Sequence, residues 1–407
     1  SHLPFNRNGF KFFTAEGGLE KGDIKQILQY AGGDDTTALP SGKLTTGTFM
    51  DTYAKILADK IRAATGEEKP LDGFRVVVDA GNGAGGFYVD KVLKPLGANT
   101  EGSRYLDPDG SFPNHIPNPE DKAAMEAITE SVNLAKADLG IIFDTDVDRA
   151  GAVLSDCSEL NRNRIIAMLA AILLREYPGT TIVTDSITST GLAKFIEEKG
   201  GVHHRFKRGY RNVINESIRL NNLGQDSQLA IETSGHGAFK ENYFLDDGAY
   251  IVTKLLIELA KGKKAGYTLE SLIASLEEPA ESKEFRFNIL QDDFKSYGLE
   301  VLDKLQAYAS EQPGWTIAPN NFEGVRVNLD EAHGSGWASS YAAEYDANDA
   351  GKYYGGCAVD NQAVFDASGR PLESLKIFAL VREGNQVAQA VDALEEVNLI
   401  CDLGKPI

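Results

Sequence analysis

The stretch that decides the fold is Leu139-Gly140-Ile141-Ile142-Phe143-Asp144-Thr145-Asp146-Val147-Asp148-Arg149. Its apolar first half is typical of a buried strand, and three acidic residues at alternate positions follow. In an extended segment alternate residues point to the same side, so we expect the three carboxylates to converge. Three close negative charges are unfavourable without a cation, and all-oxygen ligation suits a hard cation such as Mg²⁺. The alternative is an acidic turn that faces water.

Similar strands occur on both sides of this stretch. Strands are predicted at 75–79, 139–143, 181–185 and 229–231, and helices at 23–30, 50–64, 88–96, 161–176 and 250–260. After about residue 278, strands at 284–289 and 324–329 alternate with helices at 299–309 and 387–400, and 338–368 has no clear periodicity. Strand–helix alternation predicts α/β domains with parallel sheets, which bind ligands at the carboxyl ends of their strands.

Bulk properties narrow the class of protein. A chain of 407 residues is too long for one ordinary core, so we expect two to four domains. The net charge of −19 argues against a nucleic-acid binder, although a local cluster of cations can still bind an anionic substrate. The three cysteines lack metal-ligand spacing, and no apolar run approaches the roughly 18 residues of a membrane span. We expect a soluble intracellular protein, and a sequence that begins without Met leaves cytoplasm or plastid open.

Two further motifs carry reactive side chains. Ser1-His2 is followed by Lys11, and a serine beside basic groups is a candidate nucleophile; the alternative is a loop whose polar residues face water. Glu232-Thr233-Ser234-Gly235-His236 follows a predicted strand and suits the binding of sugar hydroxyls, with His236 able to move a proton. The alternative for this second motif is a helix-capping turn.

A glycine pattern supports a rival function. Gly81, Gly83 and Gly86 follow a strand, and Glu101 lies about 20 residues further on, as in dinucleotide-binding proteins. The chain would then be an oxidoreductase. Glycines at these positions are also needed for any tight strand-to-helix turn.

Together and in this order, the motifs resemble the α-D-phosphohexomutase family over roughly residues 1–330. Residues 1–11 resemble its active-site serine loop, 144–149 its metal loop and 232–236 its sugar-recognition loop. Lys207-Arg208-Gly209-Tyr210 resembles the loop that helps choose between two sugar orientations, and residues 78–85 and 113–120 also look like family stretches. In this family the glycine turn binds no nucleotide, which disfavours the oxidoreductase.

The resemblance implies the architecture. The fold class is tandem similar α/β domains with mixed or parallel sheets, plus a smaller α+β C-terminal domain around an antiparallel sheet. We expect residues 1–46 to be a remnant of the first domain, 47–157 the second, 158–281 the third and 282–407 an atypical phosphate-binding domain. Because most of the first domain is missing before the serine, we expect this chain to fold largely but to be weakly active.

The resemblance also implies the chemistry. A phosphoserine would interconvert hexose 1-phosphate and hexose 6-phosphate (glucose, mannose or both) through a hexose 1,6-bisphosphate, with Mg²⁺ as cofactor. Hexose phosphates are the expected partners, without nucleic acid or membrane, and the oligomeric state is open. The implied catalytic residues are Ser1, His2, Lys11 and His236. The implied metal ligands are Ser1, Asp144, Asp146 and Asp148. The implied substrate contacts are Arg149, Lys207, Arg208, Gly209, Glu232, Ser234 and His236.

The sequence departs from the family pattern in the last domain. Relatives carry an Arg–Ser–Gly–Thr phosphate-binding loop shortly after a Gly-Val-Arg-Val strand. Gly324-Val325-Arg326-Val327 is present, but no Lys or Arg occurs between Arg326 and Lys352. The backbone amides of Gly334, Ser335 and Gly336 could bind a phosphate instead, but without a cation nearby a plain turn is favoured. The alternative function is therefore a phosphosugar-binding pseudoenzyme or fragment.

Overall fold

The structure is a computed structural model that describes residues 12–14, 17–33, 43, 45–279, 281–289, 293–319, 321, 324–328, 335–342 and 353–361. Its described residues form two compact units. The first holds the chain up to Leu160 together with Leu245–Gly266, and the second holds Asn161–Phe244 and the chain from Tyr267 onward. None of the described helices combines the length and the apolar character needed to cross a membrane.

The first unit is built around a four-stranded sheet in the order β3-β4-β5-β6. The strands are β3 (Val76–Asp79), β4 (Leu139–Phe143), β5 (Ala150–Leu154) and β6 (Glu159–Leu160). Strand β3 runs parallel to β4, whereas β5 returns antiparallel to β4 and β6 antiparallel to β5. The α-helices are α1 (Lys21–Ala31), α2 (Phe49–Thr65), α3 (Lys122–Ala135) and α7 (Gly248–Ala265). A short hairpin of β1 (Phe13–Thr14) and β2 (Gly17–Gly18) precedes α1.

The segment predicted as a helix at 88–96 is helical, but most of it is not α-helical. A short 3₁₀ turn, η1 (Ala84–Gly86), is followed by a π turn, η2 (Val89–Leu93), and a second 3₁₀ turn, η3 (Lys94–Leu96). Pro95 has no backbone N–H to donate within a helix, and Gly97 ends the segment at a φ of +94°. The apolar spacing predicted a helix correctly but carried no information on its hydrogen-bond pattern.

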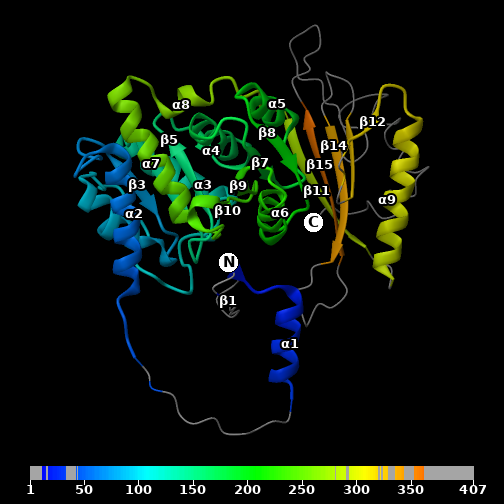
Figure 1. Ribbon diagram of the computed structural model, residues 1–407, viewed down its shortest axis with the longest axis horizontal. Helices are drawn as coiled ribbons and strands as arrows, with labels where there is room; N and C mark the ends of the chain where they lie inside the picture. Colours follow the sequence, from blue (N-terminus) through cyan, green and yellow to red (C-terminus); the bar gives the residue numbers. More distant parts are fainter. Residues whose placement is uncertain are drawn as a thin grey trace. The chain divides into compact units, whose positions relative to one another are not determined.

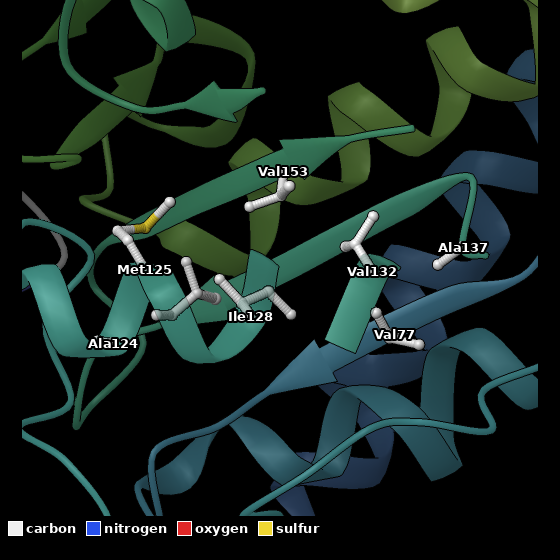
Figure 2. Packing of buried hydrophobic residues seen from close by; sticks show 8 residues of the cluster. Val77, Ala124, Met125, Ile128, Val132, Ala137 and Val153 are labelled. Atoms are coloured by element: carbon white, nitrogen blue, oxygen red, sulfur yellow. The ribbon is translucent and has the colours of Figure 1, made fainter. Parts of the chain in front are cut away.

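Helix α3 packs on the sheet through a close approach at Gly140. It begins where the Asp121 side chain accepts a hydrogen bond from the backbone N–H of Ala124, at 3.0 Å. A Cβ atom at Gly140 would overlap the side chain of Val132, so only glycine lets the helix lie this near to β4. Figure 2 shows the resulting cluster, which consists of Val77, Ala124, Met125, Ile128, Val132, Ala137, Ile142 and Val153. Burying each of the larger side chains contributes about 1.5–3 kcal/mol.

The second unit contains a four-stranded sheet in the order β10-β9-β7-β8. Its strands are β7 (Thr181–Thr184), β8 (Val202–Arg205), β9 (Ser227–Ile231) and β10 (Gly237–Phe239). Strands β8, β7 and β9 are parallel, and β10 returns antiparallel to β9. The helical segments are α4 (Arg162–Glu176), α5 (Thr190–Glu198), α6 (Tyr210–Asn222), η4 (Lys240–Asn242) and α8 (Leu269–Leu272). Parallel strands followed by an antiparallel return strand thus occur in both units.

The second unit also contains a five-stranded sheet in the order β11-β15-β14-β13-β12. Its strands are β11 (Glu281–Ile289), β12 (Thr316–Ile317), β13 (Val325–Asn328), β14 (Ser335–Ala342) and β15 (Tyr353–Asn361), and α9 (Phe294–Glu311) packs beside them (Figure 1). Leu305 and Ala309 of α9 share a core with Val325 and Val327. The α/β fold with a smaller α+β C-terminal domain is therefore confirmed.

One prediction for this region was wrong. Strand–helix alternation after residue 278 predicted parallel pairing, whereas the family resemblance implied an antiparallel sheet. All neighbouring strands of this sheet are antiparallel, as the resemblance implied. The connections between consecutive strands from β12 to β15 are too short for the crossover of a dozen or more residues that parallel pairing requires. The unassigned segment 338–368 contains part of β14 and all of β15, and the helix predicted at 387–400 lies outside the described residues.

Candidate metal and sugar sites

An acidic residue stands at the carboxyl end of four strands. Asp79 is the last residue of β3, and Asp144 directly follows β4. Asp185 follows β7 and Glu232 follows β9 in the second unit. Because the carboxyl ends of parallel neighbours lie at one edge of a sheet, each unit brings two of these acids to the edge where ligands bind.

The first candidate site is a hairpin loop, residues 144–149, which joins β4 to β5; Phe143 pairs with Ala150 at its base. One carboxylate oxygen from each of Asp144, Asp146 and Asp148 lies within 4.8 Å of the other two. Asp144 and Asp148 are buried and Asp146 is exposed. Three hard oxygen donors with one open side form a suitable partial set for a divalent cation that completes its coordination with substrate or water.

The carboxylates converge through a turn, so the expected extended conformation was wrong. The Val147 N–H donates to the Asp144 carbonyl at 3.4 Å, and Val147 adopts a φ of +67°. A β-branched residue rarely occupies this left-handed region, and such strain typically occurs at functional sites. The Arg149 N–H donates to the Asp144 side chain at 3.2 Å, which closes the loop around the first carboxylate.

The charges in this loop oppose one another's ionisation. Burial, then the hydrogen bond and charge of Asp148, raise the pKa of Asp144 from 3.8 to about 6. The Arg149 side chain partly opposes this rise; its Nε lies 3.9 Å from the Asp144 carboxylate, and its Nη1 lies 3.8 Å from that of Glu120. The loop therefore fits a divalent cation on its donor chemistry and on its electrostatics.

The glycine turn after β3 supports the metal loop. The Ala84 N–H donates to the Thr145 carbonyl at 2.8 Å, and a Cβ on Gly83 would lie 2.7 Å from the same oxygen. The four consecutive backbone N–H groups of this turn, from Gly81 to Ala84, already donate to acceptors within the protein, so they are not available to a pyrophosphate as they are in dinucleotide-binding proteins. The glycines are explained by close packing, and the oxidoreductase alternative loses its structural basis.

Helix α7 supports the same loop from another side. The Gly248 N–H donates to the Val147 carbonyl at 2.9 Å, and a Cβ on Gly248 would lie 2.6 Å from the Arg149 carbonyl oxygen. Asp247 caps this helix by accepting from the Tyr250 N–H at 3.0 Å, and it also accepts from the Tyr53 hydroxyl at 2.6 Å. These supporting residues were not predicted from the sequence, although an Asp-Gly pair before an apolar helix was a visible signal.

A buried ion pair fixes the loop of residues 113–120, for which the sequence predicted no specific role. The His115 Nε2 contacts both carboxylate oxygens of Asp79 at 3.0 and 3.1 Å, and its Nδ1 contacts the Ile116 carbonyl at 2.9 Å. Burial lowers the pKa of His115, but the hydrogen bond and charge of Asp79 outweigh it, so the pKa is raised. Because both ring nitrogens face acceptors, the imidazolium form fits this arrangement.

The second candidate site is also a hairpin loop, residues 232–236, which joins β9 to β10. The Glu232 N–H donates to the His236 carbonyl at 2.9 Å, and the Gly235 N–H donates to the Glu232 carbonyl at 3.1 Å. The loop connects two strands, so the helix-capping alternative does not apply. Glu232 and His236 are buried and Ser234 is half-buried.

The structure brings the predicted orientation loop to the sugar-recognition loop. The Gly209 N–H donates to the Glu232 carboxylate at 2.6 Å, and the Tyr210 ring stacks on His236 with centroids 5.1 Å apart. Gly209 has a φ of +106°, which favours glycine there. Nearby, Lys207 is exposed and Arg208 is half-buried. The two stretches that the sequence placed in separate motifs form one cluster.

The remaining predicted residues fall elsewhere. Ser1, His2 and Lys11 lie outside the described residues. Ser335 and Gly336 belong to β14 and pair with β13 and β15, so they form no phosphate-binding turn. Arg326 of β13 is buried and donates to the Ser186 carbonyl at 2.9 Å, next to the end of β7.

Comparisons with known proteins agree with this architecture. Residues 51–156 match the family model of phosphoglucomutase/phosphomannomutase α/β/α domain II, and residues 161–278 match that of domain III. A phosphomannomutase/phosphoglucomutase from Pseudomonas putida is 30% identical over 339 residues, which cover 83% of this chain and 67% of the relative. A phosphoglucomutase from Neisseria meningitidis is 29% identical over 336 residues, covering 82% and 68%.

A solved structure shares the fold. A phosphoglucomutase/phosphomannomutase family protein from Burkholderia thailandensis superposes with a TM-score of 0.67 at 24% identity. The match covers 93% of this chain and 71% of that protein.

Proposed function

The chain belongs to the phosphoglucomutase/phosphomannomutase family of α-D-phosphohexomutases, and we propose that it interconverts hexose 1-phosphates and hexose 6-phosphates. Glucose and mannose phosphates are the proposed substrates, and a hexose 1,6-bisphosphate is the intermediate. The observation that carries the proposal is the cluster of Asp144, Asp146 and Asp148, whose oxygens converge within 4.8 Å on a strained turn. Phosphoryl transfer needs cations to neutralise charge on the transferring group, and a divalent ion held by this cluster would supply that charge.

We propose that these three carboxylates, with the phosphorylated Ser1, hold Mg²⁺. When bound, the ion would neutralise charge on the phosphoryl oxygens. Arg149 would bind a phosphate group of the substrate, since a planar guanidinium matches phosphate oxygens in pairs.

The protein's own residues account for the rest of the reaction. A sugar hydroxyl oxygen would attack the phosphorus on Ser1, the bond from phosphorus to the serine oxygen would break, and the hydroxyl proton would pass to Lys11 or His236. His2 would lie beside the phosphoserine. The other phosphate of the bisphosphate would then return to Ser1 and leave the isomeric monophosphate.

Sugar recognition is assigned to the cluster around Glu232. Its buried carboxylate accepts hydroxyl hydrogen bonds but repels phosphate, and Ser234 adds a hydroxyl that both donates and accepts. Gly209 donates to this carboxylate, and Lys207 and Arg208 precede it in the sequence; these three residues would distinguish the two orientations in which the bisphosphate must bind.

A coupled assay tests the proposal by following conversion of hexose 1-phosphate to hexose 6-phosphate, with hexose 1,6-bisphosphate and Mg²⁺ present. We expect conversion that a chelator abolishes. Glu232→Ala should weaken hexose-phosphate binding and leave inorganic phosphate binding unchanged. Equal losses for both ligands would contradict the sugar assignment, and binding without any conversion would instead support a phosphosugar-binding protein.

A further inference from the structure

A buried acid outside the assigned site residues holds the sugar-recognition loop. Asp185 directly follows β7 and is 1% exposed. Its carboxylate accepts two hydrogen bonds from Thr233: one from the hydroxyl at 2.7 Å and one from the backbone N–H at 3.3 Å. The two residues are 48 apart in the sequence but lie at the ends of neighbouring parallel strands.

These bonds act on the residue next to Glu232. On the other side, the Gly209 N–H donates to the Glu232 carboxylate at 2.6 Å. Glu232 therefore lies between two fixed contacts, one through its neighbour Thr233 and one through its own oxygen. We propose that Asp185 is a positioning residue that holds Thr233 so that Glu232 keeps the conformation in which it accepts hydrogen bonds from a hexose. This inference rests on the proposed sugar-recognition role of the loop.

A neutral side chain would provide a similar anchor at lower cost. Asparagine could accept from the Thr233 N–H and donate to its hydroxyl, without the penalty of burying a charge. The charge therefore has a consequence of its own. Burial and then the charge of Asp185 raise the pKa of Glu232 from 4.5 to about 7. The other groups that face Glu232, which are His236, Arg208 and the Gly209 N–H, all lower it.

Removing the charge of Asp185 should lower the pKa of Glu232. Without the Asp185 charge, Glu232 loses the main electrostatic repulsion that opposes its ionisation, so its pKa should fall towards 4.5. An ionised Glu232 only accepts hydrogen bonds, whereas a neutral one also donates. Asp185 thus helps to raise the pH at which Glu232 changes between these two binding modes to a value close to neutral.

The first test uses a matched pair of variants at Thr233. Thr233→Val keeps the shape of the side chain but removes the hydroxyl, whereas Thr233→Ser keeps the hydroxyl. A hydrogen bond to a charged group contributes enough that its loss should weaken glucose 6-phosphate binding by roughly 10-fold in Thr233→Val. We expect Thr233→Ser to bind as the unmodified chain does, and Mg²⁺ affinity to be equal in all three. Equal hexose-phosphate affinity in the two variants would overturn the inference.

The second test needs no substrate. The carboxyl carbon signal of Glu232 in the full chain, assigned by its disappearance in Glu232→Gln, is titrated by NMR. We expect a midpoint near 7, and a lower midpoint in Asp185→Asn. An unchanged midpoint would show that Asp185 is only a structural anchor. A shifted midpoint in a chain that converts no hexose phosphate would leave the positioning role intact and refute the proposed function alone.

Discussion

Replacing Asp144 by asparagine should stabilise the chain when no metal is bound. Asp144 is fully buried, and its pKa is raised from 3.8 to about 6. The shift of about two units corresponds to about 3 kcal/mol, at 1.36 kcal/mol per unit. Between these two pH values the folded chain binds more protons than the unfolded one, so stability falls as pH rises through this window. Above it the ionised carboxylate destabilises the metal-free fold by that amount.

Asparagine removes the charge and keeps the shape. Its side-chain oxygen can still accept from the Arg149 N–H, which is 3.2 Å from the Asp144 carboxylate. Without divalent ions, we expect Asp144→Asn to raise the free energy of unfolding by up to about 3 kcal/mol at pH 8, and to change it little at pH 4. With Mg²⁺ at about 100 times its Kd, the unmodified chain should gain about 2.7 kcal/mol and the variant almost nothing.

Urea unfolding at the two pH values, with and without Mg²⁺, measures all four free energies. The design separates the electrostatic argument from the metal assignment, because the first predicts the pH dependence and the second the response to Mg²⁺. A variant that is less stable than the unmodified chain at pH 8 without metal would refute the first. An equal gain from Mg²⁺ in both proteins would refute the second.

Three further outcomes are expected. Asp146→Asn replaces the exposed member of the cluster, so the free energy of unfolding without metal should change by less than about 0.5 kcal/mol. The Mg²⁺ affinity measured by calorimetry should fall sharply, and an unchanged affinity would contradict the three-carboxylate site. Gly83→Ala should weaken Mg²⁺ binding, because the added methyl group would displace the metal loop. Gly110→Ala is the control, because nothing lies within 4 Å of the added atom. Equal Mg²⁺ affinities in the two variants would mean that the glycine turn does not support the metal loop. Gly140→Ala should lower the free energy of unfolding in urea by about 1–3 kcal/mol, and no loss would mean that α3 shifts to accommodate the methyl group.

The strands could be predicted well from the sequence, because a buried strand consists of a short run of apolar residues. Residues 139–143 form a short apolar run, and β4 has these bounds. The acids after β4 and β9 were also predicted, because each begins a motif that contains further charged or hydrogen-bonding side chains. The motifs also occur along the chain in the order found in phosphohexomutases, and this order predicted the family, which the comparisons confirm.

The supports of the loops could not be predicted in the same way. Val147 adopts a positive φ although valine avoids that region, so local preference pointed to an extended segment. The surrounding contacts outweigh this preference: Gly248 donates to the Val147 carbonyl, and Ala84 donates to that of Thr145. Both partners are distant in sequence from the loop. Asp185 was missed for the same reason, because its partner Thr233 is 48 residues away.

The two hairpin loops share one construction, and this explains where the chain tolerates little change. Each loop follows a parallel strand and is held by a backbone N–H from a glycine at the start of a helix: Gly248 of α7 for the metal loop and Gly209 before α6 for the sugar-recognition loop. A backbone donor positions a group without the rotamer freedom that a long side chain must lose. The acids can therefore repel one another and still converge, since the backbone and not their mutual attraction sets their positions. The glycines are then as necessary to the site as the carboxylates that their loops carry.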